Sequence, residues 1–209
     1  MRSFSAVRVR KPVACARSSP VEPRLVGVLP AIRIRTLQSA PRSPIALPTD
    51  PNTVMPERVC DYPRPPRLCA SHQHILVRAL GTPLAETRRS LRVLETYHPP
   101  TYYLPPEAMR LALLRPAAGR SFCEWKGVAR YWDVVVGERT LPAAVWSYPE
   151  PTAAFAALAG WFAVYPGRMD GCWLDGEQVR PQPGGFYGGW ISSAVQGPFK
   201  GDPAHPELI

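Results

Sequence analysis

Proline limits what this chain can fold into more than any other feature of its sequence. The 209 residues include 27 prolines. Each proline removes a backbone N–H donor and disfavours the helical conformation in the residue before it. The stretch 60–67, which contains Pro63, Pro65 and Pro66, therefore cannot form a helix. We expect short strands joined by rigid turns in place of long helices.

The positive charge of the sequence is concentrated near its N-terminus. Residues 1–49 carry eight Arg and one Lys against the single acid Glu22, a balance of +8, whereas the remaining sixteen basic and fifteen acidic side chains balance at +1. A nearly neutral remainder argues against nucleic-acid binding by a folded domain, although the basic segment itself could bind nucleic acid in a salt-dependent way.

The basic segment resembles a targeting sequence in composition. Arg-rich, Ser-containing and acid-poor starts are typical of organellar transit peptides. We therefore expect residues 1–53 to be a disordered leader and linker, and residues 54–209 to be one domain. The expected location is the chloroplast or another organelle if the leader is a transit peptide, and the cytoplasm otherwise.

Apolar and aromatic runs predict a mainly β domain. Strands are expected at 75–80, 84–88, 91–95, 102–104, 131–136, 143–148 and 161–165. Asp175-Gly176 between two such runs indicates a tight hairpin. Pro106 favours one short helix over 107–114, and Thr152 could cap a brief helical turn. The tail after Phe199 is expected to be irregular.

Several classes of protein are disfavoured by what the sequence lacks. No apolar run approaches the length of a membrane-spanning helix. The five cysteines are odd in number and contain no C-x-x-C pair, so neither a disulfide framework nor a paired zinc site is expected. We predict no metal and no cofactor.

Four motifs in order resemble the family known as domain of unknown function 427 (DUF427), sometimes labelled a nucleotidyltransferase domain. They are LETYHPPTYYLP at 94–105, CEWKG at 123–127 followed by Tyr131-Trp132, WSYP at 146–149, and the stretch 162–170. The resemblance runs from Val59 to Lys200. One departure is Tyr97, where the family often has a small residue.

The resemblance implies several small, coiled antiparallel sheets, similar to the tent-like fold of methionine sulfoxide reductase B. The nucleotidyltransferase label is less well supported, because such enzymes commonly gather Mg²⁺ with closely spaced carboxylates. Asp133, Asp170 and Asp175 are widely separated, and no phosphate-binding glycine loop occurs. This activity is kept as an alternative.

Ionisable residues within the aromatic motifs predict a pocket for a small polar or anionic ligand. His98 and Glu95 are the candidate acid–base pair, and Arg88 and Lys126 could hold a carboxylate or phosphate. The predicted walls are aromatic, as in many small-molecule sites: Tyr102, Trp125, Trp132, Trp146 and Tyr148. Cys123, close to Lys126, is a candidate nucleophile.

The same residues are also compatible with other roles. Trp and Tyr commonly form the core of small β domains, and Arg–Glu pairs often satisfy each other. A non-catalytic protein-interaction module is the main alternative, with the aromatic and glycine-rich stretch 186–190 as its surface. Whether the domain is an enzyme, which ligand it binds and its oligomeric state stay open.

Overall fold

The computed structural model describes residues 55–208. The strands in this part of the chain are β1 (Glu57–Arg58), β2 (Arg67–Ser71), β3 (Ile75–Ala79), β4 (Thr82–Thr87), β5 (Ser90–Leu94), β6 (Thr101–Tyr103), β7 (Leu114–Cys123), β8 (Gly127–Val136), β9 (Arg139–Ser147), β10 (Phe162–Val164), β11 (Gly171–Leu174), β12 (Glu177–Gln178), β13 (Arg180–Pro181), β14 (Trp190–Ile191) and β15 (Val195–Gln196). The short 3-10 helices are η1 (Val59–Asp61), η2 (Pro106–Ala108), η3 (Leu111–Leu113), η4 (Ala153–Leu158), η5 (Pro166–Arg168) and η6 (Pro206–Leu208). None of these helices is long and apolar enough to cross a membrane. The predicted leader, transit peptide and linker at 1–53 lie outside the described residues.

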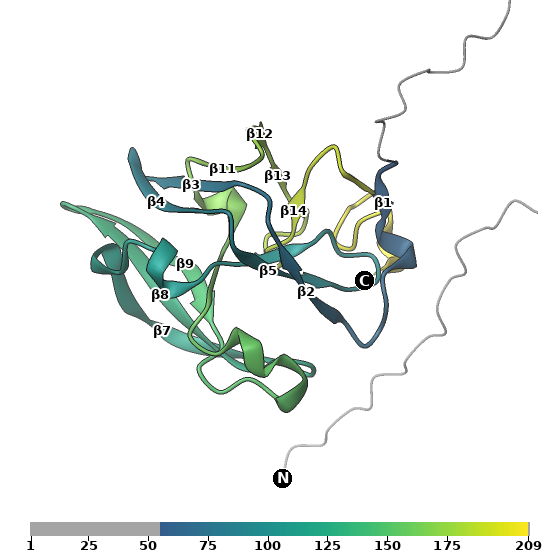
Figure 1. Cartoon of the computed structure of the whole chain (residues 1–209), viewed down its shortest axis with the longest axis horizontal. Helices are drawn as coiled ribbons and strands as arrows, with labels where there is room; N and C mark the ends of the chain where they lie inside the picture. The colour runs from purple at the N-terminus through teal and green to yellow at the C-terminus, as the bar shows by residue number, and fades with distance from the viewer. Residues whose placement is uncertain (1–54, 209) are drawn as a thin grey trace, which may run out of the picture. The chain divides into compact units, whose positions relative to one another are not determined.

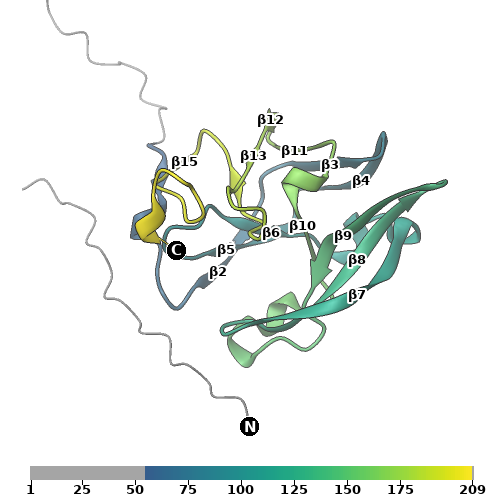
Figure 2. The ribbon, with the colours of Figure 1, turned by 180° about the vertical axis from the view of Figure 1, so that it is seen from behind.

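The strands form several small sheets, and none of the described sheets closes into a barrel. The two largest sheets have the strand orders β10-β9-β8-β7 and β12-β11-β3-β4, and a third has the order β2-β5-β6. All three are antiparallel, whereas the small pair β1 and β15 is parallel. Figures 1 and 2 show the long, twisted strands β7, β8 and β9 beside the smaller sheets. The predicted fold class, mainly β with several small antiparallel sheets, is confirmed.

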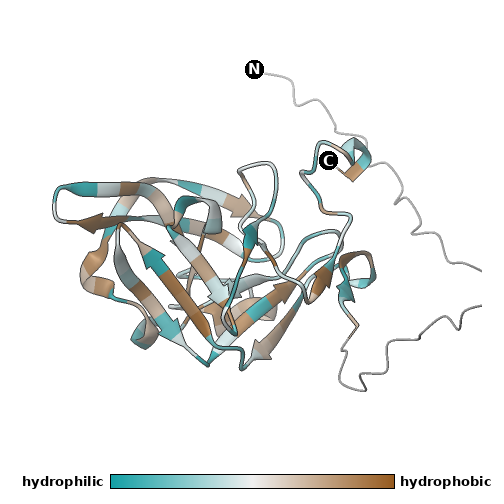
Figure 3. Ribbon diagram, turned by 90° about the horizontal axis from the view of Figure 1, so that it is seen from above, coloured by the Kyte–Doolittle hydropathy of each residue, from teal (hydrophilic) through white to brown (hydrophobic). Residues whose placement is uncertain are grey.

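Alternation along the strands contributes to two of the three hydrophobic clusters of the described residues: the first core, which includes Ile75, Val134 and Trp190, and the second core, which includes Tyr103, Trp146 and Leu158. In β10, Phe162 and Val164 pack into the first core, and Ala163 between them packs into the second. In β6, Tyr102 belongs to the first core and Tyr103 to the second. Successive side chains of a strand point to opposite faces, so one strand can contribute to both cores. Figure 3 shows the resulting alternation of hydrophobic and hydrophilic residues along several strands.

The single helix predicted over 107–114 is wrong. The chain forms the separate turns η2 and η3, and strand β7 begins at Leu114. Met109 between the turns is extended, with φ −93° and ψ 138°, and pairs with Ala85 in an isolated antiparallel bridge. Helix propensity in so short a segment is a weak determinant beside tertiary pairing.

Local turn chemistry predicted the β11–β12 hairpin correctly. Asp175 and Gly176 occupy its turn with φ of 49° and 89°, the left-handed conformation that Asp and Gly tolerate. Strand β7 was not predicted, because Pro116 and Gly119 interrupt its pattern and most of its side chains are exposed. Its partner β8 supplies the apolar alternation that this hairpin needs.

Candidate functional site

A cavity of about 430 Å³ borders the second core. One wall comes from β5 and β6, another from the β7–β8 hairpin and β9, and a third from residues 182–200. Small-molecule sites commonly occupy 300–1,000 Å³ and are lined by aromatic side chains with a few polar groups. The cavity therefore has room for a small ligand.

Register between the strands places the aromatic wall. Tyr131 on β8 lies opposite Trp146 on β9. The Trp146 ring centroid lies 4.5 Å from that of Tyr165 and 6.2 Å from that of Tyr103. Burial raises the pKa of Tyr103, Tyr148 and Tyr165 above the usual value, so these phenols stay protonated and act as neutral hydrogen-bonding groups.

His98 borders the cavity as a neutral ring. The pKa of His98 is lowered to about 4, chiefly by burial and secondly by the positive charge of Lys200. Both disfavour the charged imidazolium form. Tyr187 packs against the ring edge-on at 4.8 Å between centroids. The expectation that His98 exchanges a proton near neutral pH does not fit these surroundings.

Gln182 orients His98 through a short chain of hydrogen bonds. The amide nitrogen of Gln182 lies 3.0 Å from Nδ1 of His98 and donates to the backbone carbonyl of Lys200 at 2.9 Å. That nitrogen is a donor, so Nδ1 of a neutral His98 accepts and Nε2 carries the proton. His98 is thus a hydrogen-bond donor through its Nε2–H.

Two lysines supply positive charge to the cavity. Lys126 is only 9% exposed and lies over the Phe155 ring at 5.7 Å, and the Lys200 ammonium lies 5.9 Å from the centre of the Tyr187 ring. Neither lysine forms an ion pair with an acid in the part of the chain that the structure describes. A contact with a ring face contributes only about 0.5–2 kcal/mol, so both ammonium groups can still accept an anionic partner.

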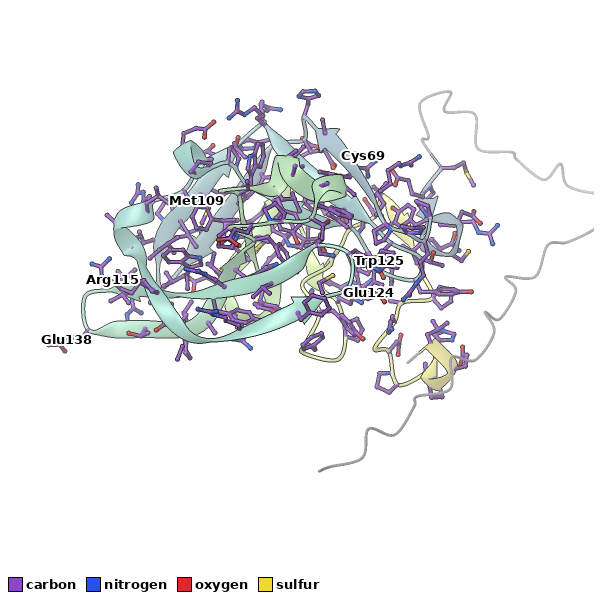
Figure 4. All side chains as sticks on the ribbon, turned by 90° about the horizontal axis from the view of Figure 1, so that it is seen from below. Cys69, Met109, Arg115, Glu124, Trp125 and Glu138 are labelled. Atoms are coloured by element: carbon purple, nitrogen blue, oxygen red, sulfur yellow. The ribbon has the colours of Figure 1, made fainter. Side chains whose placement is uncertain are left out.

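The two acids at the cavity, Glu95 and Glu124, form ion pairs with Arg64 and not with the lysines. Arg64 contacts Glu124 at 2.7 Å and Glu95 at 3.6 Å, and its guanidinium lies 5.8 Å from the centre of the Trp125 ring. Figure 4 shows Glu124 and Trp125 together near the turn of the β7–β8 hairpin, far from Glu138 on the β8–β9 turn. The Glu95 carboxylate therefore balances the Arg64 cation, and the Glu95 backbone carbonyl accepts the N–H of His98 at 2.9 Å.

Two polar atoms at the cavity residues lack a partner. The indole Nε1 of Trp125 and the amide oxygen of Gln182 are buried and form no hydrogen bond within residues 55–208. Buried polar groups are nearly always hydrogen-bonded, so each such exception calls for an explanation. Both residues line the cavity.

Six of the nine predicted site residues come together at this cavity. They are His98, Glu95, Lys126, Trp125, Trp146 and Tyr148.

The other three predicted residues lie elsewhere. Arg88 is exposed after β4 and does not line the cavity. Tyr102 packs into the first core and donates to the side-chain oxygen of Gln73 at 2.7 Å. Trp132 also packs against the first core, and its indole donates to Ser147 at 3.0 Å.

Sequence reasoning missed several residues of the site. Tyr103 and Tyr131 each adjoin a predicted residue, and correct strand phasing would have identified them. Gln182 and Lys200 lie far along the chain in segments without a recognisable motif. Lys200 reaches the site because its backbone N–H donates to the carbonyl of Tyr97 at 2.8 Å.

The scattered acids of the chain are used in turns and strands. Asp133 accepts from the backbone of Ala143, Asp170 from Gly81, and Asp175 from His74, all within 2.6–2.8 Å. Within residues 55–208, no group of three His, Cys, Asp or Glu gathers where it could hold a metal ion.

The stretch 186–190, predicted as a surface for a protein partner, is only partly exposed. Trp190 is 1% exposed and packs in the first core, where the centroid of its ring lies 5.2 Å from that of Tyr102. It therefore cannot anchor a partner. Phe186 is exposed and borders the cavity. The half-buried Cys123 also borders the cavity, and its reactivity stays a prediction.

Comparison with known proteins identifies a family for this chain. A family model described as a domain of unknown function, DUF427, matches residues 67–175, slightly more than half of the 209-residue chain. No curated protein matches the chain. The matched residues include β2 to β11 and most of the cavity wall, whereas Gln182 and Lys200 lie beyond them.

Proposed function

Because the chain belongs to the DUF427 family, whose description assigns no reaction, we propose its function from the cavity: the domain binds a small ligand that has an anionic group and an apolar part. The observation that carries this proposal is the pair Lys126 and Lys200. Both border one cavity, and neither is paired with an acid among the described residues. A bound carboxylate or phosphate would supply the counter-charge that both ammonium groups lack among the described residues.

Each group at the cavity has a distinct role in this proposal. The lysines act as positive point charges, and His98 contributes its Nε2–H as a neutral donor. The aromatic wall around Trp146 accommodates the apolar part of the ligand. Binding, and not proton transfer by His98, is what these features support.

Binding can be tested by calorimetry on the full chain with benzoate, phenyl phosphate and neutral benzamide. We expect one of the two anions to bind and benzamide not to bind. Lys126→Met keeps the length and packing of the side chain but removes its charge. A charge-assisted hydrogen bond contributes about 1.5–3 kcal/mol, so this variant should bind about 10- to 100-fold more weakly.

The matched control is Arg88→Met, which removes an exposed cation that does not line the cavity. Its affinity should equal that of the unmodified protein. Equal affinity of Lys126→Met, or benzamide binding as tightly as the anions, would contradict the proposal.

A further inference from the structure

A pair of arginines faces each other across the β7–β8 hairpin. Arg120 on β7 lies directly opposite Arg130 on β8. Both side chains are exposed, and neither forms an ion pair with an acid within the described range 55–208. Ala129 and Tyr131 pack against the second core, so Arg130 between them points to the opposite face of the hairpin.

The two arginines border a second cavity, of about 780 Å³. Its remaining wall is largely apolar and includes Pro116, Trp132 and Pro149. The register of β7 and β8 shifts between Pro116 and Arg120, and such irregularities in a strand redirect side chains and often occur near functional sites. Cations and an apolar surface therefore adjoin one another in this cavity.

Like charges directly opposite each other in an antiparallel pair destabilise it. We therefore expect Arg120 and Arg130 to make the free protein slightly less stable than uncharged residues would at these positions. A bound anion would relieve their repulsion. Residues that oppose folding but could bind a ligand are typical of functional sites, where activity is retained at a cost in stability.

The geometry of two guanidiniums favours one class of anion. Each guanidinium presents a planar fork of donors. The two oxygens of a carboxylate are satisfied by a single fork, whereas the three terminal oxygens of a phosphomonoester can accept from two. We propose that Arg120 and Arg130 bind the phosphate of a phosphomonoester, with its carrier against Pro116, Trp132 and Pro149. Among residues 55–208, only Tyr131 borders both this cavity and the first.

The test is a series of two-dimensional NMR titrations of the full chain with inorganic phosphate, phenyl phosphate and chloride at constant ionic strength. We expect saturable shifts of the backbone amides of 117–120, 130 and 132, which lie away from the first cavity, with phenyl phosphate binding more tightly than inorganic phosphate. The double variant Arg120→Gln/Arg130→Gln should bind at least tenfold more weakly. Its thermal midpoint without ligand should be no lower than that of the unmodified protein, which would show that the fold is intact.

Two controls separate this proposal from the first cavity. Arg180→Gln removes an exposed strand arginine that lies opposite Ile191 and should leave the titration unchanged. Lys126→Met should leave the shifts of residues 117–120, 130 and 132 unchanged, even if phenyl phosphate also binds in the first cavity. Equal shifts with chloride, or full binding by the double variant, would overturn the proposal. Equal affinity for both phosphates would overturn the role of the apolar wall.

Discussion

At the residue scale, His98 illustrates how the surroundings of a side chain decide its chemistry. The sequence places a histidine between Tyr97 and Pro99, which is compatible with acid–base catalysis. In the folded chain, burial and the nearby Lys200 keep its ring neutral. The ring is then better suited to donate a fixed hydrogen bond than to exchange protons at neutral pH.

The depressed pKa of His98 predicts a pH dependence of stability. Its pKa is about 4 in the folded state and 6.5 in the reference state. Above pH 6.5 neither state is protonated at His98, and the contribution to stability is complete. Between pH 6.5 and 4 the unfolded chain binds the proton first, so about 2–3 kcal/mol is lost. Urea unfolding at pH 7 and pH 4 measures this loss.

The variant His98→Asn retains a polar group near the position of Nδ1 but does not titrate. Its free energy of unfolding should fall by about 2–3 kcal/mol less than that of the unmodified protein over the same pH interval. His72→Asn, at an exposed histidine, should show the full loss. Identical pH profiles for His98→Asn and the unmodified protein would refute this role of burial.

Tyr97, next to His98, contributes to the site through its backbone. Its φ is 65°, in the left-handed region that non-glycine residues seldom occupy. The resemblance implies that the family often has a small residue at this position, and glycine, which has no Cβ, reaches positive φ at least cost. The carbonyl of Tyr97 accepts the N–H of Lys200, so this conformation helps to bring a cavity cation into place.

At the element scale, the β7–β8 hairpin serves two cavities with its two faces. One face contributes Ala129 and Tyr131 to the second core and the first cavity, and the other face presents Arg120 and Arg130. Figure 2 shows how far β7 and β8 extend beside the smaller sheets. A long twisted hairpin can therefore support two binding surfaces with a single set of backbone hydrogen bonds.

The loop between β13 and β14 borders the first cavity and packs closely against the Trp146 ring at Gly188. A Cβ on Gly188 would overlap the Trp146 ring, with Cζ3 only 2.8 Å away. Gly188→Ala should therefore displace the indole or the loop and lower the free energy of unfolding by about 1–3 kcal/mol. Urea unfolding followed by tryptophan fluorescence measures both the stability and the environment of the indole.

The matched control for this loop is Gly167→Ala. There a Cβ would meet Pro181 at 3.4 Å, an ordinary van der Waals contact. We expect its stability to change by much less than that of Gly188→Ala. If both variants unfold at the same urea concentration as the unmodified protein, the loop does not pack on Trp146 as described.

At the scale of the whole molecule, buried tyrosines in all three hydrophobic clusters make the stability of the fold depend on alkaline pH. Burial raises the pKa of Tyr102 to about 12 and the pKa of Tyr62, Tyr103, Tyr148 and Tyr165 further above the usual value of 10. A group whose pKa is raised on folding stabilises the protein fully below its unfolded pKa. This stability should be lost as the pH rises above about 10, because only the unfolded chain ionises there.

We therefore expect several kcal/mol of the free energy of unfolding to be lost above pH 10. Chemical unfolding at pH 8 and pH 11 measures the loss, and ultraviolet absorbance of tyrosinate shows when the phenols ionise. Tyr148→Phe removes one of these groups, so its stability should decline less steeply than that of the unmodified protein. Ionisation of all phenols near pH 10 in a still-folded chain would contradict the burial described.

Much of the architecture could be predicted from local patterns. Prolines excluded long helices, Asp175-Gly176 indicated a hairpin, and most strand positions followed from apolar runs. The motifs around His98, Trp125 and Trp146 do converge at one cavity. These features depend on properties of adjacent residues, namely allowed backbone angles and side-chain alternation, which a sequence contains directly.

Only the tertiary structure decided which members of each motif face the cavity. Strand phase directs Tyr103 and Tyr131 to it and their neighbours Tyr102 and Trp132 to the first core. A register shift of one residue exchanges the two faces of a strand. Bulges determine this register, and they cannot be recognised from the sequence. Gln182 and Lys200 reach the first cavity because distant segments pack, and Arg120 faces Arg130 because of the β7–β8 register. Local patterns specify neither arrangement.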